Sequence, residues 1–310
     1  MSICASVLIV AEVGKQVGWG HVARAQLLKS LLAPHMAVSV KVVNREHWDS
    51  PSLKVEFALD HIVDADIVFL DGLTLRQETD CYVRAPIKVS LSYISDMNEF
   101  VDHVIAPALN GMDSPSHFIT DLSAMLCNNP SVNMPLHSES TIEQSKNKLI
   151  GVCMGGGDAD GVAPAIVSAL AERGLEAFTY PAPSSYRLSL CEFLHRKLKS
   201  KELQPFPYSI LSDCRAVICQ GGLSAVEFAL MGMPTVIRRR TDFSDAYHFL
   251  YAQGCAMPSK VNTIPAIIDS VESVIQDSSL RHRMSKTGKA LDARLDETFW
   301  LSLVNRLMRK

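Results

Sequence analysis

The sequence predicts an α/β protein that consists of two Rossmann-like domains facing each other across a cleft. Short apolar runs alternate with segments whose apolar residues recur at helical spacing, and this alternation is typical of parallel sheets covered by helices. A strand, a glycine-rich turn and a helix follow one another near the start of the chain and again in its second half. The 310 residues are enough for two domains of ordinary size.

Composition and charge favour a globular enzyme without a nucleic-acid partner. Hydrophobic residues make up 47% of the chain and charged residues 20%, as in ordinary folded domains. The formal net charge of −3 gives no electrostatic reason to expect nucleic acid or an anionic membrane as a partner. The eight cysteines form no C-x-x-C pair, so we expect neither a metal site nor a disulfide framework. No basic region precedes the first apolar run, so we expect no signal peptide and a cytoplasmic location.

The turn before the first predicted helix carries the most concentrated chemical signal. Residues 6–10 predict a buried strand and residues 22–32 predict a helix, and Gly18, Gly20 and His21 lie between them. Glycines allow a ligand to approach the backbone, and the unpaired N–H groups of a helix start favour anions. The positive end of the helix dipole disfavours an imidazolium, so we expect a neutral His21 ring that can accept a proton. An ordinary strand-to-helix turn with a surface histidine is the alternative.

Acidic residues follow two further strands of the first half. We expect four more strands in this half, at residues 38–43, 67–72, 87–94 and 101–106. Because ligands of parallel sheets bind beyond the carboxyl ends of the strands, Asp71 and Asp96 should share one rim with the turn of His21. Asp71 could also be a helix cap or a turn acid, and for Asp96 this is the preferred interpretation.

A turn-rich and poorly periodic segment separates the two halves. Residues 128–135 and 138–141 are rich in Asn, Ser and Pro and suit a connection between domains. We therefore expect an N-terminal domain at residues 1–135, which carries the His21 turn, and a nucleotide-binding domain at residues 136–310.

The second half repeats the pattern of strand, turn and helix. We expect strands at residues 148–154, 176–180, 216–220 and 235–237, and helices at 162–173, 189–198, 225–231, 264–275, 280–291 and 295–308. The last helix is amphipathic enough to pack back on the body of the protein, so we expect no membrane span.

Two glycine turns of the second half, at residues 155–157 and 221–222, resemble the first one in their position after a strand. Ser224 and Glu227 follow the later turn. In a functional interpretation the turn binds phosphate and Glu227 accepts hydrogen bonds from a ribose. In a structural interpretation Ser224 and Glu227 form a capping box.

Two common types of nucleotide site are not favoured by the sequence. Glu46 lies beyond the end of the second predicted strand, where it is a poor ligand for an NAD ribose, so a dehydrogenase is not favoured. The sequence has no G-x-x-x-x-G-K-[ST] motif, which excludes a P-loop.

One short basic run, Arg238-Arg239-Arg240, has two interpretations. By default it is a solvated strand end. If it faces the cleft, it would help to hold phosphate.

The motifs together resemble a known family. They are, in chain order, Gly18-x-Gly20-His21-x-x-Arg24, Asp71, Ser95-Asp96, Gly155-Gly156-Gly157-Asp158, and Gly221-Gly222-x-Ser224-x-x-Glu227 with Gly232-x-Pro234. In order and spacing they are similar to the UDP-2,4-diacetamido-2,4,6-trideoxy-β-L-altropyranose hydrolases of pseudaminic acid biosynthesis. That family is related to the lipid-linked N-acetylglucosaminyltransferase of peptidoglycan synthesis and has the glycosyltransferase B fold. The resemblance extends over nearly the whole chain.

The resemblance implies a role for each matching residue. His21 would be the catalytic base that activates the water attacking the anomeric carbon, with Asp71 in the same catalytic group. UDP would leave with inversion, and neither a metal nor another cofactor would be required. The substrate-binding residues implied by the resemblance are Gly18, Gly20, Arg24, Gly155, Gly156, Gly157, Gly221, Gly222, Ser224 and Glu227, with Glu227 on the ribose. The partner would be a UDP-sugar, and the oligomeric state is left open.

Two departures from the family pattern concern the sugar. Leu73 stands where the family usually has a tyrosine, and residues 241–246 contain no match to its asparagine–glutamine pair. Both positions would contact the sugar, so the sequence does not identify it. The alternatives to a hydrolase are a glycosyltransferase of the same fold that uses a UDP-sugar donor, and a non-catalytic binder of nucleotide sugars.

Overall fold

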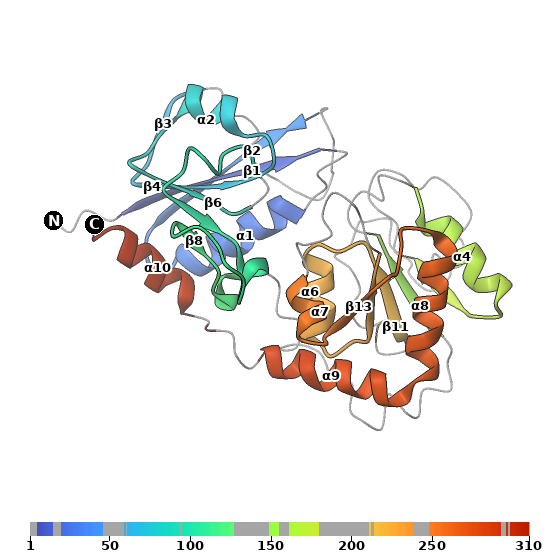
Figure 1. Ribbon diagram of the computed structural model, residues 1–310. Helices are drawn as coiled ribbons and strands as arrows, with labels where there is room; N and C mark the ends of the chain where they lie inside the picture. The colour runs from blue at the N-terminus through green and yellow to red at the C-terminus, as the bar shows by residue number, and fades with distance from the viewer. Residues whose placement is uncertain are drawn as a thin grey trace.

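The computed structural model shows two large parallel sheets, each covered by helices or loops on both faces (Figure 1). It describes residues 5–14, 20–45, 59, 61–92, 95–126, 149–154, 161–179, 211, 214–238, 248–292, 296 and 298–309. We call the first sheet with its covering elements the first lobe, and the second sheet with its helices the second lobe. In Figure 1 the first lobe lies at the upper left and the second at the lower right.

Six strands form the first sheet in the order β2-β1-β4-β6-β7-β8, and all neighbouring pairs are parallel. They are β1 (Ser6–Val13), β2 (Ala37–Asn44), β4 (Ile67–Asp71), β6 (Ile87–Ser90), β7 (His103–Ile105) and β8 (Phe118–Ile119). β1 and β4 lie inside the sheet and are buried on both faces, which explains their nearly continuous apolar sequence. A separate small sheet pairs β3 (Val63–Asp64) with β5 (Val83–Arg84).

Two helices from opposite ends of the chain cover one face of the first sheet. α1 (Gly20–Leu32) contributes Val22, Ala25, Leu28 and Leu32 to this core, and α10 (Phe299–Leu307) contributes Trp300, Leu303, Val304 and Leu307. The other face is covered by Leu75 and Met97, which lie on either side of the short helix α2 (Arg76–Tyr82) in sequence. The helix α10 therefore belongs to the core of the first lobe, although it follows the second lobe in the sequence.

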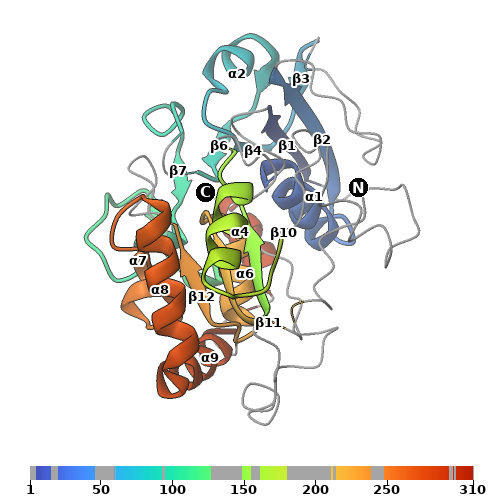
Figure 2. The same cartoon turned by 90° about the vertical axis from the view of Figure 1, so that its right-hand side faces the viewer.

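The second sheet has the order β10-β9-β11-β12-β13 and is also parallel throughout. Its strands are β9 (Leu149–Cys153), β10 (Ala177–Thr179), β11 (Cys214–Cys219), β12 (Thr235–Ile237) and β13 (Ala256–Pro258). Its helices are α4 (Ala163–Glu172), α6 (Leu223–Leu230), α7 (His248–Ala252), α8 (Ile264–Gln276) and α9 (Ser278–Asp292). α4 and α8 pack on one face (Figure 2), and α6 and α7 pack on the other.

The approach of α9 to α6 requires a glycine. A Cβ atom added at Gly288 would lie 1.9 Å from the carbonyl oxygen of Ala229. Because no side chain fits this distance, the two helices can pack at this separation only with a hydrogen at position 288.

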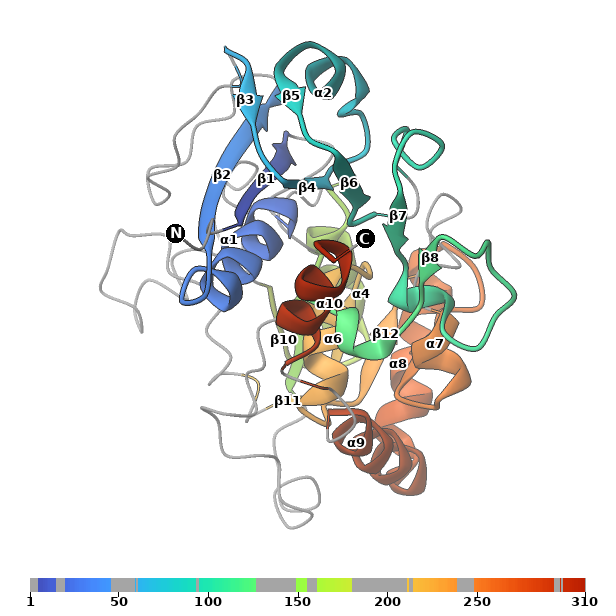
Figure 3. The ribbon, with the colours of Figure 1, turned by 90° about the vertical axis from the view of Figure 1, so that its left-hand side faces the viewer.

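The segment between β8 and β9 contributes to both cores. It contains the 3-10 turns η2 (Pro107–Leu109) and η3 (Leu122–Ala124). Leu122 belongs to the core of the second lobe, whereas Ala124 and Leu126 belong to that of the first. Figure 3 shows this segment beside α10 and α7.

The predicted α/β fold class is confirmed, and most predicted strands and helices are present with shifted ends. The strand expected at 87–94 ends at Ser90, where the Ser90 hydroxyl donates to the carbonyl oxygen of Ser92 and turns the chain. The helices α2 and α7 and the strands β3, β5, β8 and β13 were not predicted. The helix expected at 189–198 and the domain boundary after residue 135 lie outside the described residues, so the domain limits stay a prediction.

Candidate active site

A histidine, an aspartate and an arginine meet at the carboxyl edge of the first sheet. His21 and Arg24 lie at the start of α1, and Asp71 is the last residue of β4. Nδ1 of His21 is 2.5 Å from Oδ1 of Asp71, and Nε of Arg24 donates to Oδ2 at 3.0 Å. Nη2 of Arg24 also donates to Oδ1 of Asp71 and lies 2.8 Å from Nδ1 of His21. The cluster thus joins the strand end to the helix start.

The charges of this cluster determine which nitrogen of His21 carries the proton. Asp71 is fully buried, whereas the side chains of His21 and Arg24 are 13% and 21% exposed. Burial alone would raise the pKa of the Asp71 carboxyl, but Arg24 and His21 outweigh it and leave this pKa below its ordinary value. An ionised carboxylate only accepts hydrogen bonds, so Nδ1 of His21 carries a proton. In a neutral ring, Nε2 is then the nitrogen that can accept a proton.

The sheet topology explains why these residues come together. Ala11 of β1 is the register partner of Asp71, and the chain runs from β1 to the start of α1. In a parallel sheet the strand end and the following helix start lie at the same edge, so His21 reaches the neighbouring strand. Gly20 is the first residue of α1, and a Cβ atom added there would meet no atom within 4 Å. Gly18 lies outside the described residues.

A second polar cluster, which the sequence analysis missed, lies beside Asp71. Glu12 of β1 is 1% exposed and accepts hydrogen bonds from the backbone N–H groups of Leu73 and Thr74. Arg45 donates to Glu12 and also to Glu78 on α2. The signal that could have revealed it is an acidic residue inside an otherwise apolar strand, because a buried carboxylate needs partners.

Asp96 has the structural role that the sequence analysis preferred. Its Oδ1 accepts a hydrogen bond from the backbone N–H of Leu75 at 3.1 Å, and its own N–H donates to the carbonyl oxygen of Leu73 at 3.0 Å. Asp96 therefore closes the turn after β4.

The glycine turn after β11 has the backbone that its sequence predicts, but its capping differs. Gly221 and Gly222 have φ values of +93° and +91°, a region that residues with a side chain rarely adopt. α6 begins at Leu223 with Gly222 as its N-cap, so Ser224 is the second helical residue and not a cap. The alternative of a capping box is therefore wrong. Glu227 lies on the same helix and is 6% exposed.

Arg238 is buried beside this turn, contrary to the default expectation of a solvated strand end. The residue is 7% exposed, and its Nε donates to Oδ1 of Asn262 at 2.7 Å. Its Nη1 donates over 3.4 Å to Oε1 of Gln220, which directly precedes Gly221. A cation thus lies at the carboxyl edge of the second sheet. Gly155, Gly156 and Gly157 are outside the described residues, as are Arg239 and Arg240.

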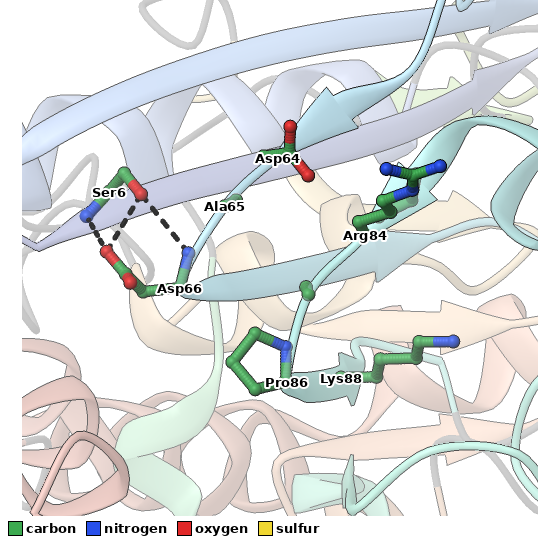
Figure 4. Close-up of a pocket in the computed structure, with 9 residues that line it drawn as sticks. Ser6, Asp64, Ala65, Asp66, Arg84, Pro86 and Lys88 are labelled. Carbon is green, nitrogen blue, oxygen red and sulfur yellow. Dashed lines mark hydrogen bonds between the residues drawn. The ribbon is translucent and has the colours of Figure 1, made fainter.

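Two open pockets lie on opposite edges of the first lobe. One of about 600 Å³, lined by Ser6, Asp66, Arg84 and Lys88 among others, is at the amino ends of the strands. Figure 4 shows the Asp66 carboxylate turned toward Ser6, with which it forms hydrogen bonds. The other, of about 580 Å³, is lined by Arg45, Thr74, Arg76, Gln77, Asp80 and Asp96 near the carboxyl edge. Only the second is on the side of Asp71, where ligands of parallel sheets bind.

Two further kinds of feature are absent from the described residues. They contain no group of three or more His, Cys, Asp or Glu side chains placed to hold a metal ion. No helix in the described part of the chain has the length and apolar character that crossing a membrane requires.

Comparison with known proteins establishes the fold class. No protein-family model matches the sequence, and no curated protein has a significantly similar sequence. Solved structures with the glycosyltransferase B fold match nearly the whole chain. MnaA of S. aureus in complex with UDP has a TM-score of 0.58 at 12% identity, over 98% of this chain and 96% of that chain.

Two other matches carry different activities on the same fold. The spinosyn rhamnosyltransferase SpnG has a TM-score of 0.58 at 14% identity, over 99% of this chain and 100% of its own. The UDP-GlcNAc 2-epimerase of Neisseria meningitidis bound to UDP-GlcNAc has a TM-score of 0.53 at 13% identity, over 98% of this chain and 100% of its own. The protein therefore has a glycosyltransferase B-type fold, a class that includes more than one reaction.

Proposed function

We propose that this protein is a nucleotide-sugar hydrolase that releases UDP from a UDP-linked sugar with inversion at the anomeric carbon. The observation that carries the proposal is the contact between His21 and the buried, ionised Asp71. A histidine whose Nδ1–H is held by a carboxylate presents Nε2 as a base, which is the arrangement that recurs in enzymes with an activated nucleophile.

In the proposed reaction, Nε2 of His21 accepts a proton from water while the water oxygen bonds to the anomeric carbon. The bond from this carbon to the diphosphate oxygen breaks, and UDP takes the electron pair. Because water attacks from the side opposite UDP, the configuration inverts. A positioned base of this kind contributes about 10²–10⁴-fold to the rate. Asp71 stabilises the imidazolium that forms, and no cofactor is needed.

The second lobe would bind the nucleotide. The turn at Gly221 and Gly222 leads into α6, whose first N–H groups are suited to phosphate, and Arg238 lies beside this turn. The family resemblance adds Ser224 and the glycines at 18, 20 and 155–157 to the nucleotide and sugar contacts, and it assigns the ribose to Glu227. The structures of MnaA with UDP and of the epimerase with UDP-GlcNAc support UDP as the nucleotide.

The proposed substrate is an amino-deoxy sugar nucleotide of nonulosonic (pseudaminic) acid biosynthesis. This part of the proposal is based on the motif resemblance alone. Leu73, in place of the family's tyrosine, lies in the loop directly after Asp71 and is half-buried. A difference at this position would change the sugar that is accepted without changing the base or the nucleotide.

A glycosyltransferase is the second candidate, because a rhamnosyltransferase shares the fold over the whole chain. Incubating the purified protein with a panel of UDP-sugars, with and without carbohydrate or lipid acceptors, separates the two. The hydrolase proposal expects free sugar and UDP in equal amounts without an acceptor. Release of UDP only with an acceptor would establish a transferase, and binding of UDP without turnover of any donor would establish a non-catalytic binder.

A further inference from the structure

Glu12 is a buried acid at the candidate site that the proposed reaction does not use. Its Oε2 accepts from the backbone N–H groups of Leu73 at 2.6 Å and Thr74 at 3.1 Å. Its Oε1 accepts from the Thr74 hydroxyl at 2.5 Å and from Nε of Arg45 at 3.0 Å. Four donors thus converge on one carboxylate, which is enough to satisfy both of its oxygens.

The cluster keeps Glu12 ionised inside the protein. Burial raises the pKa of its carboxyl, but the hydrogen bonds from Thr74, Leu73 and Arg45 together leave this pKa below its ordinary value. Arg45 also donates to both carboxylate oxygens of Glu78 on α2 and to the carbonyl oxygen of Thr74. The loop of residues 72–74 is therefore held at its N–H groups by Glu12 and at a carbonyl by Arg45.

The loop of residues 72–74 lies so close to β1 that a side chain at position 72 would collide with Glu12. A Cβ atom added at Gly72 would lie 2.6 Å from Cβ of Glu12 and 2.7 Å from its Oε2. This distance is too short for any side chain, so a glycine at position 72 is what lets the loop lie against Glu12.

Arg24 holds the Asp71 carboxylate, but the backbone of Asp71 depends on this loop because β4 pairs with a neighbouring strand on one side only at this position. Its register partner on β1 is Ala11, whereas the pairing of β4 with β6 ends one residue earlier, at Leu70 and Ser90. The backbone that follows Asp71 is fixed by side chains: by Glu12 on one side and by Asp96 on the other.

We propose that Glu12 is a positioning residue: by fixing residues 72–74 against β1 it holds the Asp71 carboxylate at Nδ1 of His21, and so sets the tautomer of the base. Glu12 touches neither His21 nor the reacting atoms and acts only through the loop. The kinetic consequence rests on the proposed function, but the effect on the His21 ring does not.

The test is the tautomer of His21, measured from its ring ¹⁵N shifts through the non-exchanging ring protons. The His21 signals are assigned by their loss in His21→Gln. In the wild-type protein we expect the Nδ1–H form, and in Glu12→Gln we expect a lower fraction of it, because an amide cannot accept from all four donors. Glu78→Gln is the matched control. Like Glu12→Gln, it removes a carboxylate that pairs with Arg45, but the Glu78 carboxylate itself does not contact residues 72–74. This control should leave the His21 signals unchanged.

A second variant covers the case in which Glu12→Gln does not fold. Thr74→Val keeps the shape of the side chain and removes one hydrogen bond to Glu12, and it should shift the tautomer in the same direction to a smaller extent. An unchanged His21 tautomer in the folded variants overturns the proposal, as does a shift of equal size in Glu78→Gln. If the wild-type ring is not in the Nδ1–H form, then Asp71 does not set the tautomer and the proposal also fails.

Kinetic measurements distinguish a failure of the role proposed for Glu12 from a failure of the proposed hydrolase activity. If the protein hydrolyses a UDP-sugar, Glu12→Gln should lower kcat by about 10- to 100-fold, as misplaced catalytic groups do, with a KM within about threefold of wild type. A loss confined to KM would contradict the positioning role. A shifted tautomer in a protein that turns over no UDP-sugar would uphold the role of Glu12 and refute the hydrolase.

Discussion

The rings of Phe69 and Trp300 are in edge-to-face contact, with centroids 5.8 Å apart and 74° between their planes. Phe69 lies in β4, two residues before Asp71, and Trp300 is in the last helix. The strand that ends in the candidate site is therefore packed against the C-terminal end of the chain.

Replacing Trp300 should destabilise the first lobe. Trp300→Ala removes a large buried side chain and should lower the free energy of unfolding by about 3–5 kcal/mol. Trp300→Phe should cost clearly less, because Nε1 of Trp300 is buried without a hydrogen-bond partner among the described residues. Urea denaturation followed by circular dichroism measures both. Equal losses for the two variants would show that the indole nitrogen does have a partner.

Removing the proposed base should separate catalysis from binding. His21→Ala should lower turnover of the UDP-sugar by about 10²–10⁴-fold. The affinity for UDP, measured by isothermal titration calorimetry, should stay nearly unchanged, because the nucleotide is proposed to bind the second lobe. Turnover comparable to wild type would remove His21 from the mechanism.

Acid should destabilise the protein through two of its buried carboxylates, those of Asp71 and Glu12. The pKa values of Asp71 and Glu12 in the folded protein lie below their ordinary values of 3.8 and 4.5, so near these pH values the unfolded chain binds more protons. Their stabilising contribution is complete above the ordinary pKa values and is lost as the pH falls through the lowered ones. Urea denaturation at a series of pH values from about 6 to 3 should therefore show falling stability. Asp71→Asn should make the slope shallower, and an identical slope would contradict the lowered pKa of Asp71.

Gly288 should be intolerant of any side chain. Gly288→Ala places a Cβ atom 1.9 Å from the Ala229 carbonyl oxygen and forces α9 away from α6. We expect a loss of about 3 kcal/mol or more in the free energy of unfolding, at the upper end for overpacked cores. Thermal denaturation is sufficient to detect a change of this size, and a stability within about 1 kcal/mol of wild type would contradict the helix contact.

Gly20, unlike Gly288, should accept a side chain without loss of stability. Gly20→Ala adds its methyl group to open space at the start of α1 and favours the helix by up to about 1 kcal/mol, so the stability should be unchanged or higher. If the loop approaches the substrate, as we propose, the added methyl group should lower kcat/KM by about tenfold or more. Wild-type kinetics would show that the substrate does not contact this position.

The parts of the fold that the sequence predicts are those in which burial determines the residue type. Strands such as β1 and β4 are buried on both faces and are almost continuously apolar, so their runs are easily recognised. α2 was missed because its sequence, RQETDCY, is mostly polar and has no apolar stripe. The strand β13 is only three residues long, too short for a periodic pattern.

At the candidate site, sequence reasoning was limited to contacts that follow from topology. The carboxyl ends of parallel strands lie at one edge of a sheet, and this rule placed Asp71 near the turn of His21. The effect of Arg24 on the pKa of Asp71, by contrast, depends on side-chain geometry. Glu12 and Arg45 are 33 residues apart and meet only because β1 and β2 are neighbours. Likewise, Arg238 meets Asn262 only because β12 pairs with β13.

The position of α10 has a consequence for biosynthesis. All strands of the first sheet precede the second lobe in the chain, yet α10, which shares one face of this sheet with α1, follows the second lobe and is translated after it. Until α10 has been synthesised, the part of this core around Phe69 lacks the contact that Trp300 makes in the folded protein. The first lobe therefore cannot complete its core before the second lobe has been translated.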